Sequence, residues 1–230
     1  MQSKSNVLSK HSCSILLFSY FILYLGVYQL FFMDEILETM GFQTYIMINI
    51  VVMVAFLIFF IVIGFRWYDA QWNKFCDIFR SGALEVLKGV LLLFALNIFV
   101  SIFIQMIFPI TPAENQVNNE FVMMLSPFNA IFGSAIFAPF IEETVFRGCI
   151  FAKIRERHSF WLAAFINGTL FGFLHIFASI LARNWINCVY IFLYGTLGMV
   201  LCLPYERTGS IFTSIFTHSL FNLLGILMML

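Results

Sequence analysis

The stretch Tyr45–Phe65, YIMINIVVMVAFLIFFIVIGF, holds no charged residue across its 21 positions. As a helix it would extend ~31 Å at about 1.5 Å per residue, which matches the ~30 Å hydrocarbon core of a bilayer. It also lacks the alternation of polar and apolar residues that is typical of a membrane barrel strand. We therefore predict that this stretch is a transmembrane helix.

Apolar stretches of about this length recur along the chain. The seven stretches are 14–33, 45–65, 88–108, 128–152, 160–181, 185–203 and 210–230. Backbone in hydrocarbon must satisfy its own hydrogen bonds, which favours helices here. We predict an all-α polytopic transmembrane bundle with about seven spans. Residues 1–230 would form a single membrane domain, with N-terminal helices in 1–126 and a helical core that carries the motifs in 127–230.

The composition excludes several classes of protein. Hydrophobic residues make up 62% of the chain and charged residues 10%, against roughly 45–50% and 25% in an ordinary soluble domain. A soluble enzyme and a disordered chain are therefore excluded. The five cysteines include no Cys-x-x-Cys pair, which argues against a disulfide scaffold. The net charge of +0 gives no electrostatic reason to expect a nucleic-acid partner.

The positions of Lys and Arg predict the orientation, because cytoplasmic loops carry an excess of them. Eleven of the twelve fall on one side of the predicted bundle: Lys4, Lys10, Arg66, Lys74, Arg80, Lys88, Arg147, Lys153, Arg155, Arg157 and Arg207. Only Arg183 falls on the other side. We predict a cytoplasmic N-terminus in a multi-pass protein of a bacterial cytoplasmic membrane. We also expect a loop or short interfacial helix at 66–87 and a long outer loop at 109–126.

Polar and ionisable side chains interrupt three of the spans, where they are costly and usually face the bundle interior. They occur in PFIEETVFRG (139–148), FGFLH (171–175) and HSLFN (218–222). Residues four apart share a helix face, so we expect a structural ion pair between Glu143 and Arg147. Glu142 would then point away without an obvious counter-ion, which makes it a candidate general base.

Counting from the predicted turns places the polar groups at one depth. Glu142 lies 16 residues before a turn expected near His158, and His175 lies 17 residues after it. Measured from a turn expected near Arg207, His218 and Asn222 lie at a similar level and share one face. A Gly-x-x-x-Gly face formed by Gly168 and Gly172 would let another helix approach beside His175.

This set of groups suits amide hydrolysis without a protein nucleophile. A carboxylate and an imidazole can hold and deprotonate a water, while a second His and an Asn amide can donate to a developing oxyanion. The sequence contains neither a His-Glu-x-x-His zinc motif nor a Gly-x-Ser-x-Gly elbow.

The ordered motifs Glu142-Glu143-x-x-x-Arg147, Phe171-x-x-x-His175 and His218-x-x-x-Asn222 resemble the CAAX-protease and bacteriocin-processing family of intramembrane endopeptidases, also called the Abi family. The resemblance covers roughly 135–225. It implies a membrane protease in which Glu142 and His175 activate water, and His218 and Asn222 form an oxyanion hole. Glu143, Arg147 and Phe171 would support these four residues.

A catalytic zinc held by Glu142, His175 and His218 is the alternative to metal-free water. We favour the metal-free form, because one ring nitrogen of His218 cannot both bind a metal and donate to an oxyanion. The other nitrogen of a ligating His normally bonds an acid or a carbonyl, and the span 210–230 holds no acidic residue. We therefore expect no cofactor.

The resemblance implies a peptide or protein substrate: prenylated CAAX proteins in eukaryotes, and bacteriocin, signalling or leader peptides in bacteria, with some members acting in self-immunity. We expect the bacterial kind of substrate and a lipid bilayer as the setting. Two other function classes stay open, a non-catalytic membrane immunity or scaffold protein and a small transporter. The sequence leaves the oligomeric state open.

Overall fold

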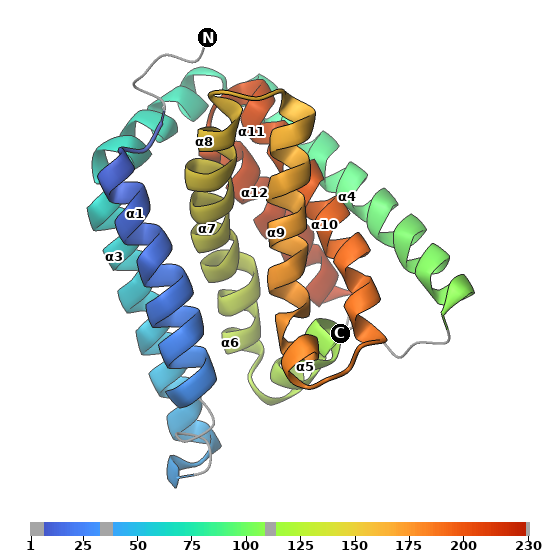
Figure 1. The fold of residues 1–230 in the computed structure, drawn as a ribbon. Coiled ribbons are helices and arrows are strands. Elements are labelled where there is room, and N and C mark those ends of the chain that lie inside the picture. Colours follow the sequence, from blue (N-terminus) through green and yellow to red (C-terminus); the bar gives the residue numbers. More distant parts are fainter. Residues whose placement is uncertain (1–6, 33–38, 109–113, 229–230) are drawn as a thin grey trace.

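The protein is a bundle of helices packed side by side (Figure 1). The computed structural model describes residues 7–32, 39–108 and 114–228, and all regular structure within these ranges is helical. The elements are α1 (Lys10–Phe18), η2 (Ser19–Phe32), α3 (Phe42–Asp77), α4 (Phe79–Ile107), α5 (Glu114–Leu125), α6 (Pro127–Ile131), η3 (Phe132–Phe137), α7 (Ala138–Glu143), η4 (Thr144–Phe151), α8 (Ala152–Arg155), α9 (Phe160–Leu181), η5 (Asn187–Tyr190), α10 (Ile191–Val200), α11 (Cys202–Thr208) and α12 (Ile211–Leu227). The predicted all-α bundle is confirmed.

Each of the seven predicted spans coincides with helical structure. Five helical stretches of the described chain are long and apolar enough to cross a membrane: Lys10–Gln29, Phe42–Asp77, Phe79–Ile107, Phe160–Leu181 and Asn187–Thr208. The helix Ile211–Leu227 is apolar but shorter. The remaining predicted span forms the helix from α6 to α8, which carries the two glutamates. The chain is therefore a multi-pass membrane protein.

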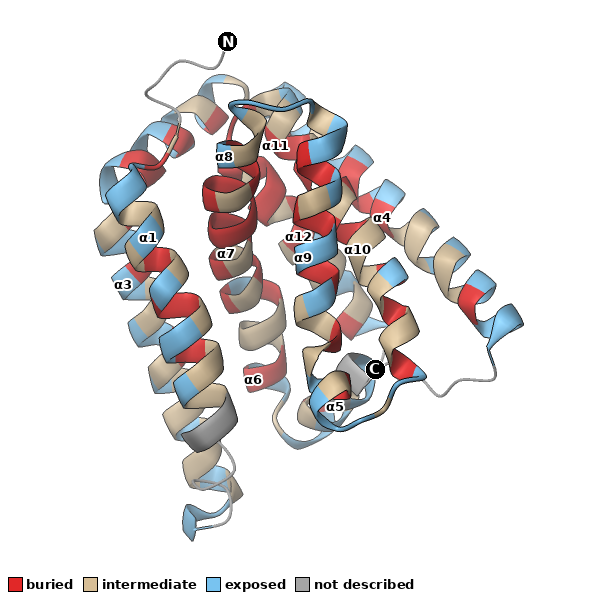
Figure 2. Cartoon of the chain, in the orientation of Figure 1, coloured by how far each residue is buried: buried red, intermediate tan, exposed pale blue. Residues whose placement is uncertain are grey.

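Large apolar side chains cover the outside of the bundle. On α3 and α4, Val62 is 66% exposed and Phe99 is 67% exposed. Buried residues instead concentrate on α7 and the turns that follow it, as Figure 2 shows. This inversion, with apolar residues outside and polar residues within, is expected when lipid surrounds the protein.

Residues 127–155 form one continuous helix with two π-helical segments, η3 and η4, on either side of α7. Pro127 is tolerated at its first turn because the missing N–H would have no partner there. The wider π turns change the direction in which successive side chains point, and such turns are frequent at functional sites. Glu142 and Glu143 thus lie on a short α-helical piece between two π-helical pieces.

Two predicted segments differ from the structure: the loop or short interfacial helix at 66–87, and the outer loop at 109–126. Residues 66–77 continue α3 and residues 79–87 begin α4, so that only Ile78 separates the two helices. The stretch contains no Pro and no strong helix breaker before Gly82. Helix α3 can therefore continue beyond the apolar run that ends at Phe65. The segment predicted as an outer loop at 109–126 contains α5 from Glu114 to Leu125, while its residues 109–113 lie outside the described ranges.

The extension of α3 fixes the helices that carry the site. The Gln71 side-chain oxygen accepts a hydrogen bond from the backbone N–H of Ile211 at 2.8 Å, which satisfies a free donor at the start of α12. Tyr68 shares a hydrogen bond of 2.8 Å with Thr144, directly after α7. Helix α3 therefore orients both α7 and α12.

The turns predicted near His158 and Arg207 are present. Ser159 caps α9 by accepting a hydrogen bond from the N–H of Leu162, and Gly209 follows α11 with a left-handed φ of 64°. A glycine is favoured there, because this backbone conformation is strained for other residues. Ion pairs of 2.9 Å join Arg155 to Glu206 and Arg207 to Glu85 at this end of the bundle.

Helices α9 and α10 approach very closely, as the Gly-x-x-x-Gly pattern predicts. A Cβ atom on Gly172 would lie 2.8 Å from the backbone nitrogen of Gly195, and one on Gly168 would lie 2.5 Å from the carbonyl oxygen of Gly195. Neither position has room for a side chain. The contact sets the position of His175 on α9 relative to α10.

Candidate active site

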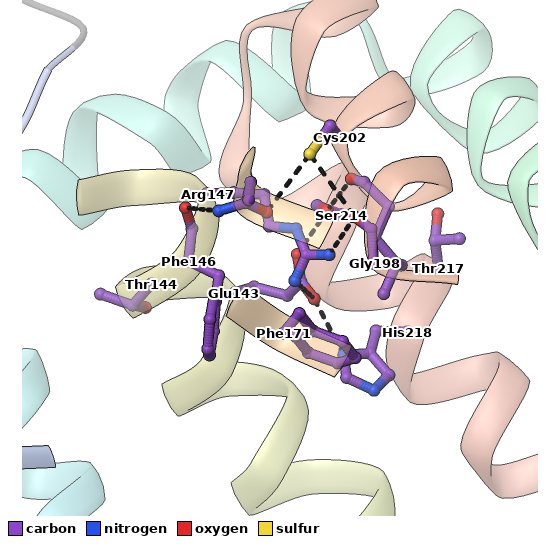
Figure 3. Close-up of polar contacts among 12 residues, drawn as sticks. Glu143, Thr144, Phe146, Arg147, Phe171, Gly198, Cys202, Ser214, Thr217 and His218 are labelled. Atoms are coloured by element: carbon purple, nitrogen blue, oxygen red, sulfur yellow. Dashed lines mark hydrogen bonds and ion pairs between the residues drawn. The ribbon is translucent and has the colours of Figure 1, made fainter. Parts of the chain in front are cut away.

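The three motif-bearing segments meet inside the bundle. Glu142 and Glu143 lie on α7, His175 lies on α9, and His218 and Asn222 lie on α12. Figure 3 shows Glu143, Arg147 and His218 pointing toward one another from α7, η4 and α12. The site is therefore assembled by segments far apart in the chain.

Glu143 is the centre of a fully buried polar network. One of its carboxylate oxygens accepts hydrogen bonds of 2.9 Å from Arg147 Nη1 and 2.9 Å from His218 Nδ1. The other oxygen accepts a bond of 2.6 Å from the hydroxyl of Ser214. The predicted ion pair between Glu143 and Arg147 is confirmed. It is one part of a larger network that joins α7, η4 and α12.

Arg147 extends this network to α10 and α9. Its Nη2 donates to the backbone carbonyl of Gly198 at 2.6 Å, and its guanidinium carbon lies 4.9 Å from the centre of the Phe171 ring. A buried arginine over an aromatic face gains a cation–π attraction in addition to its ion pair. Phe171 therefore supports Arg147 directly.

The bond to Glu143 fixes the tautomer of His218. A carboxylate that already accepts from Arg147 can only accept, so Nδ1 of His218 carries the hydrogen. In the neutral ring Nε2 then has a free lone pair, and Nε2 can donate only when the ring is an imidazolium. The side chain is buried, with 5% of the residue exposed.

His175 is held in one orientation by its own helix and by α10. Its Nδ1 lies 2.9 Å from the carbonyl oxygen of Phe171, so Nδ1 carries the hydrogen and Nε2 holds a lone pair. The ring packs against Phe171 at 4.3 Å and stacks on Tyr194 at 4.6 Å between ring centres. Its free nitrogen can therefore accept a proton or bind a metal.

Glu142 differs from Glu143 in its surroundings. Within the described part of the chain its carboxylate makes no hydrogen bond and no ion pair, and the residue is half-buried. It lines two cavities at once, as does His175. A carboxylate that no protein group holds is available to a ligand or a water in either cavity.

Asn222 joins α12 to η3. Its side-chain Nδ2 donates to the backbone carbonyl of Ser134 at 2.8 Å. An amide nitrogen carries two hydrogens, so one remains available. Asn222 lines the smaller cavity together with His218.

The two cavities differ in size and lining. The larger, of about 1090 Å³, lies between η2, α3, the helix containing α7, and α9, and most of its lining is apolar or aromatic, including Tyr24, Phe137 and Phe173. The smaller, of about 630 Å³, lies between α4, α7, α9, α10 and α12 and has a more polar lining. Glu142 and His175 line both. The pair thus lies where an apolar and a more polar space meet.

Sequence reasoning missed several residues of the site. Ser214 holds Glu143, Tyr194 stacks on His175, and the Gly198 carbonyl accepts from Arg147. A signal for Ser214 was present, because Ser214, His218 and Asn222 stand four residues apart and share one helix face. The contacts of Gly198 and Tyr194 depend on the packing of α10, which no local pattern encodes.

A catalytic zinc would require Glu142, His175 and His218 to converge on one point. Over residues 7–32, 39–108 and 114–228, no three His, Cys, Asp or Glu side chains gather as a metal site. Glu142, His175 and His218 therefore do not form a ligand set in this arrangement. The expectation that His218 lacks an acid for its second nitrogen is wrong, because Glu143 provides one from α7. A hydrogen bond from the second ring nitrogen to a carboxylate is common for histidines that bind a metal.

Comparison with known proteins supports the interpretation of the motifs. Residues 124–224 match the family model described as "Type II CAAX prenyl endopeptidase Rce1-like". This region is therefore similar to the Rce1-like family over 101 of the 230 residues. The predicted resemblance is confirmed, and the Rce1-like region begins in α5 and ends in α12, so that it contains every motif residue from Glu142 to Asn222.

Two bacterial relatives share part of the chain. The protein named "Putative membrane peptidase YdiL" of Bacillus subtilis (strain 168) is 30% identical over 97 residues, which cover 42% of this chain and 36% of the relative. The "UPF0177 protein YvdC" of Lactococcus lactis subsp. lactis (strain IL1403) is 26% identical over 148 residues, which cover 64% of this chain and 53% of the relative. The matches thus span about a third and about half of these relatives. No solved structure matches the chain.

Proposed function

We propose that this protein is an intramembrane endopeptidase that hydrolyses a peptide bond with a water activated by Glu142 and His175. The observation that carries the proposal is the position of Glu142, which no group of the described residues holds and which, like His175, lines both cavities. The Rce1-like family match and the peptidase named among the relatives support the same class of reaction.

In the proposed reaction, water attacks the carbonyl carbon of the substrate while its proton passes to the carboxylate of Glu142. A second hydrogen of the same water donates to the free Nε2 of His175, whose orientation Phe171 and Tyr194 fix. A positioned base of this kind typically contributes about 10²–10⁴-fold in rate.

The oxyanion that forms would be stabilised by His218 and Asn222. Because Nδ1 of His218 donates to Glu143, Nε2 can donate to the oxyanion only when the ring is protonated on both nitrogens. The free hydrogen of the Asn222 amide supplies a second donor. Collapse of the intermediate breaks the C–N bond, and Glu142 returns the proton to the leaving amine. The products are one new carboxylate and one new amine.

We propose that the water is activated without a metal. The support is that Glu142, His175 and His218 do not gather as a ligand set. Prolonged chelation is then expected to leave cleavage unchanged, with no metal bound in proportion to active chains by elemental analysis. One zinc per active chain, lost together with activity and restored by readdition, would overturn this part.

For the substrate we propose a bacteriocin, signalling or leader peptide, or a target connected with self-immunity, in a bacterial cytoplasmic membrane. Both relatives named above are bacterial. The apolar lining of the larger cavity suits an uncharged segment that enters from lipid. A non-catalytic immunity or scaffold protein and a small transporter are the competing functions, and neither requires a bond to be broken.

The test is hydrolysis in isotopically labelled water. The purified chain in lipid nanodiscs is incubated with a mixture of bacterial peptides in water enriched in ¹⁸O, and products are identified by mass spectrometry. We expect a restricted set of cleavages, each with one ¹⁸O in the new carboxylate. If no bond breaks while the chain stays folded, the scaffold or the transporter is the better description.

A further inference from the structure

Helix α4 carries a line of uncharged polar side chains within an apolar span. Asn97, Ser101 and Gln105 stand four residues apart and therefore share one helix face. They extend ~12 Å along the helix at about 1.5 Å per residue. The adjacent Ile98 and Ile102 are 57% and 54% exposed on the outside of the bundle.

These polar groups have no hydrogen-bond partner in the part of the protein that the structure describes. Within the described ranges, no hydrogen bond joins the side chain of Asn97, Ser101 or Gln105 to another group. In contact with hydrocarbon, a polar group without a partner costs free energy. Water is the partner that would satisfy all three without a specific geometry.

All three side chains line the smaller cavity, which Glu142, His175 and His218 also line. Gln105 lies two residues from the end of α4 at Ile107, and Asn97 lies deeper in the span. The polar face of α4 thus leads from near one end of the bundle toward the candidate active site. The larger, apolar cavity reaches the same Glu142 and His175 from the side of η2 and α3.

We propose that the polar face of α4, formed by Asn97, Ser101 and Gln105, lines the route by which water reaches Glu142 and His175, while the apolar cavity receives the substrate. The presence of water along α4 is independent of catalysis, and its use as the attacking reagent rests on the proposed function. In this proposal water and substrate reach the site through different cavities, and they meet only at the carboxylate of Glu142.

The test compares cysteines on the two faces of α4. In a chain that lacks the five native cysteines, Ser101→Cys is compared with Ile102→Cys, and Asn97→Cys with Ile98→Cys. The chain is reconstituted in lipid vesicles and treated with a charged, membrane-impermeant methanethiosulfonate. We expect at least about tenfold faster modification on the polar face, since the reacting thiolate does not form in apolar surroundings.

Equal rates on the two faces, or faster modification at Ile98→Cys and Ile102→Cys, would overturn the proposal. If a pair does not purify as a monodisperse species, Gln105→Cys against Met106→Cys gives the same comparison, since Met106 is 81% exposed. Peptide cleavage is measured separately. Equal modification rates would contradict the water route but not the proposed role of Glu142. An absence of peptide cleavage would contradict the proposed function but not the presence of water along α4.

Discussion

Glu142 and Glu143 are neighbours in the sequence, yet they lie in different surroundings. Glu143 accepts from Arg147, His218 and Ser214, whereas Glu142 faces two cavities with no protein partner among the described residues. The four-residue spacing was enough to predict the bond between Glu143 and Arg147. The bond to His218 joins positions 75 residues apart, and it depends on tertiary packing that the spacing does not encode.

Replacing Glu143 by Gln tests its structural role. The pair with Arg147 has no exposed surface on either side chain, and an unpaired buried charge left by such a change costs about 3–5 kcal/mol. We expect the Glu143→Gln chain to unfold at a clearly lower temperature in detergent, as followed by circular dichroism. Unchanged stability of Glu143→Gln, or an equal loss in Glu142→Gln, would contradict the division of roles.

At the scale of helices, the sequence predicted where helices occur better than where they begin and end. Each of the seven apolar runs coincides with helical structure, although α5 was not predicted, and Gly168 with Gly172 predicted a close helix contact. The continuation of α3 through residues 66–77 was missed, because charged and aromatic residues there suggested a loop or a short interfacial helix. Gln71 and Tyr68 lie in that extension and hydrogen-bond to the start of α12 and to the residue after α7. The π-helical segments beside α7 have no recognised local signal in this sequence.

The contact of α9 with α10 can be tested with a single methyl group. Gly172→Ala places a Cβ 2.8 Å from backbone atoms of Gly195 and Ile191, and overpacking of this kind costs about 1–3 kcal/mol. We expect a lower unfolding temperature and a loss of cleavage, because His175 shifts relative to Tyr194.

Gly225→Ala is the matched control for this change. A Cβ on Gly225 meets nothing within 4 Å, and Ala is favoured over Gly in a helix by ~1 kcal/mol. Its unfolding temperature is therefore expected to stay the same or rise. If both alanine variants are equally stable, the close approach of α9 and α10 does not matter energetically.

At the scale of the whole molecule, α8 and α11 lie together at one end of the bundle (Figure 1). These two helices and the turn after α8 contain Lys153, Arg155, Arg157 and Arg207. The charge pattern predicts that this end is cytoplasmic. That orientation follows from the sequence and stays a prediction, since no membrane is part of the structure. The apolar cavity, by contrast, could not be predicted, because two of its walls come from η2 and α3, which contain none of the motifs.

Orientation can be measured by labelling intact cells. In a background without the native cysteines, Asn73→Cys on α3 and Gln116→Cys on α5 lie at exposed positions near opposite ends of the bundle. We expect an impermeant thiol reagent to label Gln116→Cys and to reach Asn73→Cys only after the cells are permeabilised. Labelling of Asn73→Cys alone on intact cells would show that the orientation is the reverse of the predicted one.

The central claim is that Glu142 performs the chemistry, and the rate of peptide cleavage by purified Glu142→Gln tests it most directly. Glu142 makes no bond to the described protein, so this variant is expected to fold with unchanged stability. Its cleavage rate should fall by at least roughly 10²-fold, the usual contribution of a general base. Glu156→Gln, which removes a carboxylate paired with Lys153 outside the site, should keep the wild-type rate. Full turnover by a folded Glu142→Gln chain would contradict the account.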